Sequence, residues 1–334
     1  MDPVLAHILD AAGRAPSAHN TQPWLLRWLG TVLEVRVNRG RCLPAADPSY
    51  VDILHSLGAM LENVLLTLAH LGYIPSYRVA EHMDFDSPMA WVWWRKSTEV
   101  PPDPGLYRMI PIRRTSRLRY IPEPVEPEAL DALRTAVGPR CVLHVLTNAE
   151  AISTVRALVA EATAELLTER HTAMELRAWI RFSSHDRRWY RDGLTAACLG
   201  WKPWEAAAAK LMLSPAVLRF LTRWGLHHTL CANVDQQAPP APALCLLMVE
   251  TDTCAARIEA GRCLQRLWLT AASFGLVTHP LNAALDVSST RERTLEIFHT
   301  LPTQHHVNLF RLGRSAAPAR SPRLPVDEIL FSIA

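Results

Sequence analysis

Apolar and polar positions along the chain follow two patterns, one typical of strands and one typical of helices. Short apolar segments bounded by turn residues predict strands, whereas longer segments with apolar residues at helical spacing predict helices. Amphipathic helices are expected at Pro3–Ala12 and Pro127–Ala136. Strands are expected at Trp24–Leu29 and Thr31–Val37, which would form a hairpin around Gly30, and at Met89–Arg95, Cys141–Leu146, Ala243–Val249 and His305–Leu312.

The chain contains an internal repeat. The segments Leu57–Gly72 and Ala260–Gly275 align without a gap, share several Gly, Leu, Thr and Ala positions, and place Glu62 opposite Gln265. Both segments are apolar nearly all round, so each predicts a buried central helix that ends at a glycine. The two amphipathic helices named above form a weaker pair of copies. We therefore expect two related halves in one chain.

The second copy is longer than the first, because residues from about 165 to 240 have no counterpart. This insertion is rich in Arg, Trp and Ala and is broken by Gly and Pro, so it predicts several short helices that form a lid. The proline-rich segment 100–104 marks the joint between the halves. The prediction is an α+β fold with a degenerate first half at 1–110 and a second half at 111–334, including the lid and a C-terminal wrapping arm at about 313–334.

Composition and charge are those of an ordinary globular protein. Of the 334 residues, 49% are hydrophobic and 20% are charged, which excludes disorder, collagen and coiled coil. The net charge of +3 is too small to indicate a nucleic-acid or membrane partner. Seven cysteines without C-x-x-C spacing suit reduced thiols. Because we find neither a signal-peptide pattern nor an apolar stretch of membrane-spanning length, we expect a cytoplasmic protein.

Three segments carry more polar and cationic groups than packing requires. The loop from Pro16 to Trp24 offers hydroxyl and amide groups of both hydrogen-bonding senses, which can bind a heterocycle. The segment Arg113–Arg117 combines three guanidinium groups with two hydroxyls, which can enclose a phosphate. The segment Arg320–Pro325 holds further guanidinium groups between prolines. Taken singly, the three could equally be an Asx-turn loop, a solvated basic turn and an arginine-rich tail.

Other chemistries are not indicated by the sequence. The pairs His227/His228 and His305/His306 occupy adjacent positions and cannot share one helical or strand face, so no metal site is expected. The chain has no G-x-G-x-x-G, P-loop or G-x-S-x-G motif. Their absence argues against Rossmann, NTPase and α/β-hydrolase functions.

In combination, the motifs make the chain similar to the nitroreductase family of flavoproteins, specifically its fused double-repeat, Acg-like branch. The resemblance covers nearly the whole chain apart from much of the insertion. It implies an α+β, nitroreductase-like fold in which two pseudo-symmetric halves replace the family's intertwined dimer. The motifs are P-S-x-x-N-x-Q-P-W at Pro16–Trp24, R-R-T-x-R at Arg113–Arg117, G-x-x-L-Q-x-x-W-L at Gly261–Leu269 and S-P-R-L-P at Ser321–Pro325.

The same resemblance implies one FMN site between the halves. The first half keeps the P-S-x-x-N loop, and the second half keeps the arginine segment. A loop at His279–Ala283 resembles the one that faces flavin N5, although family members often carry an acidic residue and glycine where this chain has Asn282 and Ala283. The implied phosphate contacts are Arg113, Arg114, Thr115, Arg117, Arg320 and Arg323, and the implied contacts to the rest of FMN are Pro16, Ser17, Asn20, Pro280, Asn282 and Ala283.

The implied function is that of an FMN-dependent oxidoreductase acting on a small organic substrate. NAD(P)H would be the reductant, or the enzyme would carry out an oxidation such as a desaturation in a biosynthetic pathway. The alternative is a non-catalytic protein that binds and sequesters flavin under a closed lid. Because the fused halves replace a dimer, a monomer is expected. Hydride chemistry belongs to the flavin, so the sequence assigns no catalytic residue.

Overall fold

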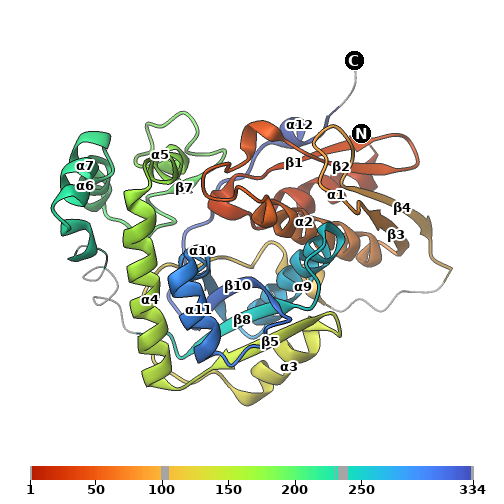
Figure 1. Ribbon diagram of the computed structural model, residues 1–334. Coiled ribbons are helices and arrows are strands. Elements are labelled where there is room, and N and C mark those ends of the chain that lie inside the picture. Colours follow the sequence, from red (N-terminus) through yellow and green to blue (C-terminus); the bar gives the residue numbers. More distant parts are fainter. Residues whose placement is uncertain (1, 99–104, 230, 232–239, 332–334) are drawn as a thin grey trace.

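Two four-stranded antiparallel sheets form the framework of the computed structural model, which describes residues 2–98, 105–229, 231 and 240–331 (Figure 1). The proline-rich segment 100–104, expected to join the halves, lies outside these residues. The first sheet has the order β1-β2-β4-β3, with β1 Trp24–Trp28, β2 Leu33–Val37, β3 Tyr73–Val79 and β4 Ala90–Lys96. The second has the order β5-β8-β10-β9, with β5 Cys141–Leu146, β8 Ala243–Val249, β9 Val277–Pro280 and β10 His305–Gly313.

The order of elements is the same in both halves. A short helix precedes the first strand, and a long helix connects the second strand to the third. The third strand lies at the edge of the sheet and pairs with the fourth. These helices are α1 Pro3–Gly13 and α2 Val51–His70 in the first half, and α3 Pro127–Val137 and α9 Cys254–Ser273 in the second. The predicted α+β architecture with two related halves is confirmed.

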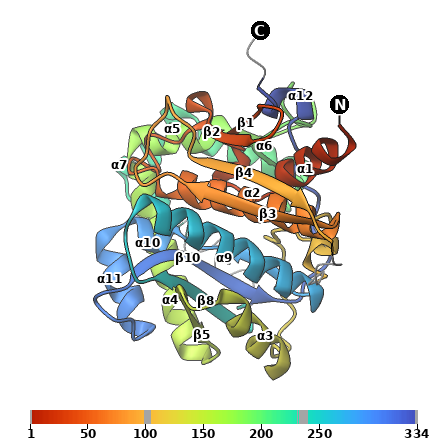
Figure 2. The same ribbon diagram turned by 90° about the vertical axis from the view of Figure 1, so that its right-hand side faces the viewer.

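The central helices α2 and α9 lie side by side between the two sheets (Figure 2). They meet at the two glycines that the repeat shares. A Cβ atom on Gly58 would lie 1.9 Å from the carbonyl oxygen of Ile258, and one on Gly261 would lie 2.2 Å from that of His55. Any larger residue would therefore force the helices apart. The repeated glycines are explained by this close crossing.

Polar contacts fix the register of the same crossing. The Gln265 amide donates to Asn63 Oδ1 at 2.7 Å, and the buried Glu62 carboxylate accepts from Arg262 and Arg266. The helix α2 is long and apolar enough to cross a membrane, but 89% of its apolar window is buried inside the protein. It is therefore accounted for as a core helix.

The insertion lies between β5 and β8, so it begins earlier than the expected residue 165. Its first element is a long helix that packs on the outer face of the second sheet. The buried residues of α4 form a hydrophobic cluster there with those of α10 and β10. Beyond α4 the chain makes short elements only, including a helical pair that projects from the body (Figure 1). The described elements of the insertion include α4 Ala149–Thr168, α5 Arg170–Trp179, β6 Ile180–Arg181, β7 Leu194–Thr195, α6 Pro203–Met212 and α7 Pro215–Arg223. Two further helices, α10 Ala283–Asp286 and α11 Ser288–Ile297, lie outside the insertion, between β9 and β10.

After β10 the chain returns to the first half. Leu324 and Ile329 are buried in the core of the first half, and Leu330 bridges to Leu26 of β1. The last helix, α12 (Val326–Ile329), packs against α1 and β1. The C-terminal segment therefore ties the two halves together.

Candidate functional site

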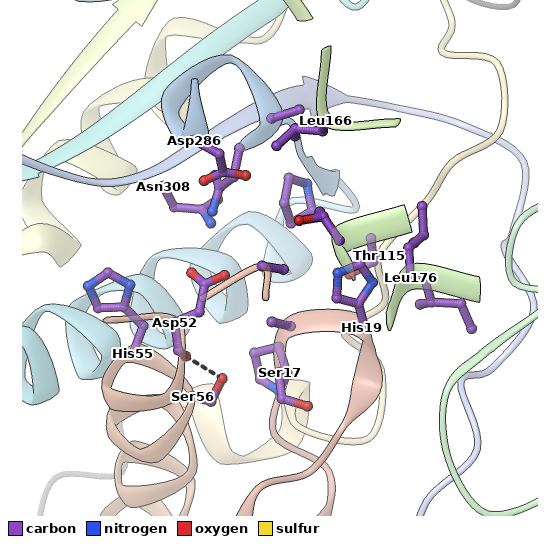
Figure 3. A pocket seen from close by; sticks show the side chains of 18 of the residues that line it. Ser17, His19, Asp52, His55, Ser56, Thr115, Leu166, Leu176, Asp286 and Asn308 are labelled. Carbon is purple, nitrogen blue, oxygen red and sulfur yellow. Dashed lines mark hydrogen bonds between the residues drawn. The ribbon is translucent and has the colours of Figure 1, made fainter. Parts of the chain in front are cut away.

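A cavity of about 460 Å³ lies between the two halves and is covered by the insertion (Figure 3). The first half contributes the loop after α1 and the start of α2. The second half contributes the segment after residue 114, the face of α9 and the loop after β9. From the insertion, α4 and α5 add an apolar wall of Leu166, Leu167 and Leu176. Seven of the residues expected at the site line this cavity: Pro16, Ser17, Thr115, Arg117, Pro280, Asn282 and Ala283.

Two arginines lie at or next to the cavity: Arg117 is partly buried and lines it, and Arg113 is buried against Trp268 of its wall. Within the described chain, neither Arg113 nor Arg117 has a hydrogen-bonding or ion-pair partner for its guanidinium group, and Arg113 Nε and Nη1 are fully buried. Burial, and then repulsion from Arg323, lowers the pKa of Arg113 to about 9. Burial also lowers the pKa of Arg117 to about 10. Because an unpaired buried cation is costly, this arrangement favours an anionic ligand.

The arginine segment reaches the cavity by pairing with β9. Thr115 forms a parallel bridge with Thr278, and the Ser116 N–H donates to Thr278 O at 2.9 Å. This pairing brings the segment next to the loop that holds Pro280 and Asn282. Trp268 of α9 contacts the same segment, because the Arg113 guanidinium lies 5.8 Å from the centre of its ring.

The other arginines expected at the site have different surroundings. Arg114 donates to Pro318 O at 3.0 Å, and Arg320 is exposed. Arg323 is partly buried and donates to Asn20 Oδ1 at 2.8 Å and to the carbonyl oxygens of Pro322 and Arg14. None of these three lines the cavity in the described residues. Arg113 does not line it either, and its guanidinium lies over the ring of Trp268, which does.

The loop after α1 has a strained backbone. His19, Asn20 and Gln22 have positive φ angles of 48°, 56° and 54°, a conformation that non-glycine residues adopt at a cost of about 1–3 kcal/mol each. Asn20 does not line the cavity. Its Nδ2 instead donates to Gly193 O in the insertion and to Pro322 O in the C-terminal segment. The loop is therefore held by contacts to two separate parts of the chain, the insertion and the C-terminal segment.

Gln22 also binds the insertion and the C-terminal segment, whereas His19 faces the cavity. The Gln22 amide donates to Arg191 O and accepts from the Leu324 N–H, so it also joins the insertion to the C-terminal segment. His19 faces the cavity, and its Nδ1 is buried without a partner. Burial and the nearby Arg117 lower the pKa of His19 to about 4, so its ring is neutral at neutral pH.

The loop after β9 is fixed by the second sheet. Pro280 lies opposite Phe310 of β10, and Asn282 Oδ1 accepts from the Leu309 N–H at 3.1 Å. Asn282 also precedes α10, whose first residue is Ala283. The Asn282 side chain thus holds the loop in place against β10.

Sequence reasoning missed a second polar group, on the side of the cavity opposite Thr115 and His19 (Figure 3). Asp52 and His55 extend from α2, Asp286 from α10 and Asn308 from β10. Burial, with repulsion from Asp47 and Asp286, raises the pKa of Asp52 to about 8. Burial and Asp47 raise that of Asp286 to about 7. No local motif marks these residues, because they come together only in the folded chain.

The fold and site define a protein of two α+β halves that enclose a cavity lined by Arg117 and by polar groups from both halves. Its relatives include proteins from two strains of Mycobacterium tuberculosis, CDC 1551 and H37Rv, each named putative NAD(P)H nitroreductase. Each is 29% identical over 287 residues, which cover 85% of this chain and 78% of the relative. The similarity to these proteins agrees with the resemblance that the motifs carry. No family model matches it.

Solved structures are also similar to parts of this chain. An FMN-dependent nitroreductase, NfnB from Mycobacterium smegmatis, in complex with NADPH, is 17% identical and has a TM-score of 0.41. The match covers 68% of this chain and 97% of that one. A nitroreductase with bound FMN from Bacteroides fragilis is 13% identical, with a TM-score of 0.39, and the match covers 69% of this chain and 98% of that one.

Proposed function

We propose that the protein is an FMN-dependent oxidoreductase of nitroreductase type that acts on a small organic substrate. The observation that carries this proposal is a pair of guanidinium groups without hydrogen-bonding partners in the described residues: that of Arg117, which lines a large cavity, and that of the buried Arg113, two residues earlier in the chain for which the same holds. A phosphate monoester would satisfy both, and the Thr115 hydroxyl beside them is a further donor. The curated relatives, named NAD(P)H nitroreductases, support the same assignment.

The residues present fit an FMN group in three respects. Arg113, Thr115 and Arg117 would hold the phosphate, and the residues Pro16–Ser17 and Pro280–Ala283 would enclose the ring from the two halves. His19 Nδ1 is a further buried polar atom without a partner. Bound FMN would supply the hydride acceptor and donor. The leucines of α4 and α5 would exclude water from the reacting face.

The proposal also extends to the reductant, the direction of the reaction and the oligomeric state. NAD(P)H is the reductant that the names of the relatives suggest. Both sets of FMN-binding residues belong to one chain, so we propose that the protein acts as a monomer. Sedimentation equilibrium of the FMN-loaded protein would test this, and a stable dimer would contradict it.

One experiment separates the proposed reductase from a flavin-storing protein. The visible spectrum of the purified protein is recorded, FMN is added if needed, and NADPH is then added without oxygen. The proposal predicts a yellow protein whose absorbance near the flavin maximum is lost. A protein that takes up no FMN would refute both functions. A yellow protein that neither NADPH nor NADH bleaches would refute the NAD(P)H reductase and favour storage or substrate-driven oxidation under the insertion.

A further inference from the structure

The side of the cavity away from Thr115 is lined by oxygen acceptors that have no donors. Asp52 and Asp286 approach it from different halves, and within the described residues neither carboxylate accepts a hydrogen bond. Asn308, which is 7% exposed, faces the same space, and its Oδ1 is buried without a partner. Figure 3 shows these three side chains directed toward one another across the cavity. We call Asp52, Asp286 and Asn308 the acceptor group.

The strand β10 changes register at Asn308. Its ladder with β8 is interrupted between His306 and Asn308. The buried amide of Asn308 therefore sits at a strand irregularity, a feature found next to ligand sites in many sheets. A buried amide oxygen without a donor costs about 1–3 kcal/mol, so its exposure to the cavity points to a ligand that donates.

The arginines near the acceptor group, Arg257 and Arg291, donate their hydrogen bonds to other groups. Arg257 donates to Asp252 Oδ1 at 2.6 Å and also to the carbonyl oxygen of His306. Arg291 donates to Leu285 O and Ser288 Oγ. The nearby Asp47 adds negative charge, although it accepts from the Ile53 N–H.

The neighbouring histidines do not supply a cation either. Burial and Arg257 lower the pKa of His55 to about 3 and that of His306 to about 4. Both rings are therefore neutral at neutral pH. His55 Nε2 is buried without a partner and lines the cavity beside Asp52.

We infer that the acceptor group binds a protonated amino or amidinium group of the substrate, whose flat apolar body lies against Leu166, Leu176 and Trp268. This inference rests on the proposed function, because it concerns the substrate of the flavin site. The oxidised flavin ring has a single N–H donor, at N3, whereas the two carboxylates and the Asn308 amide present five oxygens. A cationic ligand would satisfy these oxygens and remove the repulsion between the carboxylates.

Binding of such a cation should release protons from the protein. At pH 7.5 the raised pKa values of Asp52 and Asp286 leave a fraction of both carboxyls protonated. A bound ammonium stabilises the ionised forms, so protons leave the protein as the ligand binds. Neutral isosteres of the same ligand release none.

The test uses two matched pairs of probes on the FMN-loaded protein: benzylamine against benzyl alcohol, and benzamidine against benzamide. Isothermal titration calorimetry at pH 7.5, in buffers of different ionisation enthalpy, gives both the dissociation constant and the protons released. We expect each cation to bind at least tenfold more tightly than its neutral partner, with proton release. The double variant Asp52→Asn/Asp286→Asn should reduce this preference to less than twofold.

The matched control is Asp131→Asn, because Asp131 is an exposed residue of α3 that pairs only with Arg134. It should keep the full preference for cations. Equal binding of cation and neutral partner, absence of binding by all four probes, or a preference that survives in the double variant would each overturn the inference. If those results come from a protein that still holds FMN, the proposed function stands. If the wild type takes up no FMN, the proposed function fails, and the same titration of the FMN-free protein decides the inference.

Discussion

Replacement of Arg113 by methionine should change stability and FMN affinity in opposite directions. In the FMN-free protein the guanidinium is buried without a hydrogen-bonding or ion-pair partner among the described residues, and burial lowers its pKa from 12.5 to about 9. Since one pKa unit corresponds to about 1.4 kcal/mol, burial of the charge costs at most about 5 kcal/mol. Because the pKa of Arg113 is lowered in the folded protein, this cost is present in full below about pH 9. It disappears only above the pKa that the side chain has in the unfolded chain.

The substitution also removes a favourable contact. The Arg113 guanidinium lies 5.8 Å from the Trp268 ring centre, a cation–π distance worth about 0.5–2 kcal/mol. We therefore expect the FMN-free Arg113→Met protein to gain about 1–3 kcal/mol in free energy of unfolding at pH 7. Urea denaturation of the stripped protein, followed by tryptophan fluorescence, measures this gain.

FMN affinity should fall in the same variant. Arg113 Nε and Nη1 can each donate to a phosphate oxygen, and a hydrogen bond to a charged group contributes about 1.5–3 kcal/mol. Loss of both corresponds to a weakening of about 10²–10⁴-fold, which a titration of flavin fluorescence detects. Arg114→Met is the control, because Arg114 donates to Pro318 O and its loss should lower stability instead. An FMN dissociation constant within threefold of wild type, or a less stable Arg113→Met protein, would refute the reasoning.

Three further predictions concern the crossing, the acceptor group and the strained loop. Gly58→Ala should cost more than about 3 kcal/mol or prevent folding, because its Cβ would meet backbone 1.9 Å away, whereas Gly40→Ala, with 3.4 Å to its nearest atom, should melt within a few degrees of wild type. Asp52→Asn should stabilise the ligand-free protein at pH 9 but not at pH 4, because an acid whose pKa is raised to about 8 loses folding stability as the pH rises; equal melting shifts at both pH values would contradict this. Asn20→Ala should increase cleavage of the insertion by trypsin, since it removes bonds to Gly193 O and Pro322 O, and an unchanged digestion rate would count against that role.

Much of the fold could be predicted because the two halves repeat one pattern. Gly58 and Gly261 were visible as matched positions in the sequence, and the structure explains them by one helix crossing. The edge strands β3 and β9 were missed for physical reasons. Tyr73–Val79 contains Pro75 and mixes polar with apolar residues, which suits an edge strand but gives no alternation. Val277–Pro280 has only four residues.

The candidate site was predictable only where its residues are close together in the sequence. Thr115 and Arg117 belong to one short cationic segment, so their common purpose could be inferred before the fold was known. Asp52 and Asp286 are single carboxylates in different halves, and only the packing of α2 near α10 places them in one cavity. Arg323 illustrates the opposite case, because its motif suggested a phosphate contact while its guanidinium donates to Asn20 Oδ1.

The return of the chain to the first half has a consequence for how the protein folds during synthesis. Leu324 and Ile329 are core residues of the first half, together with side chains from α1 and β1. The first half therefore cannot complete its core while it is being made, and it must wait for residues translated some 300 positions later. The C-terminal segment also bonds to Asn20 and Gln22 of the loop after α1, so a ribosome-bound chain without these residues should lack those contacts at the cavity loop.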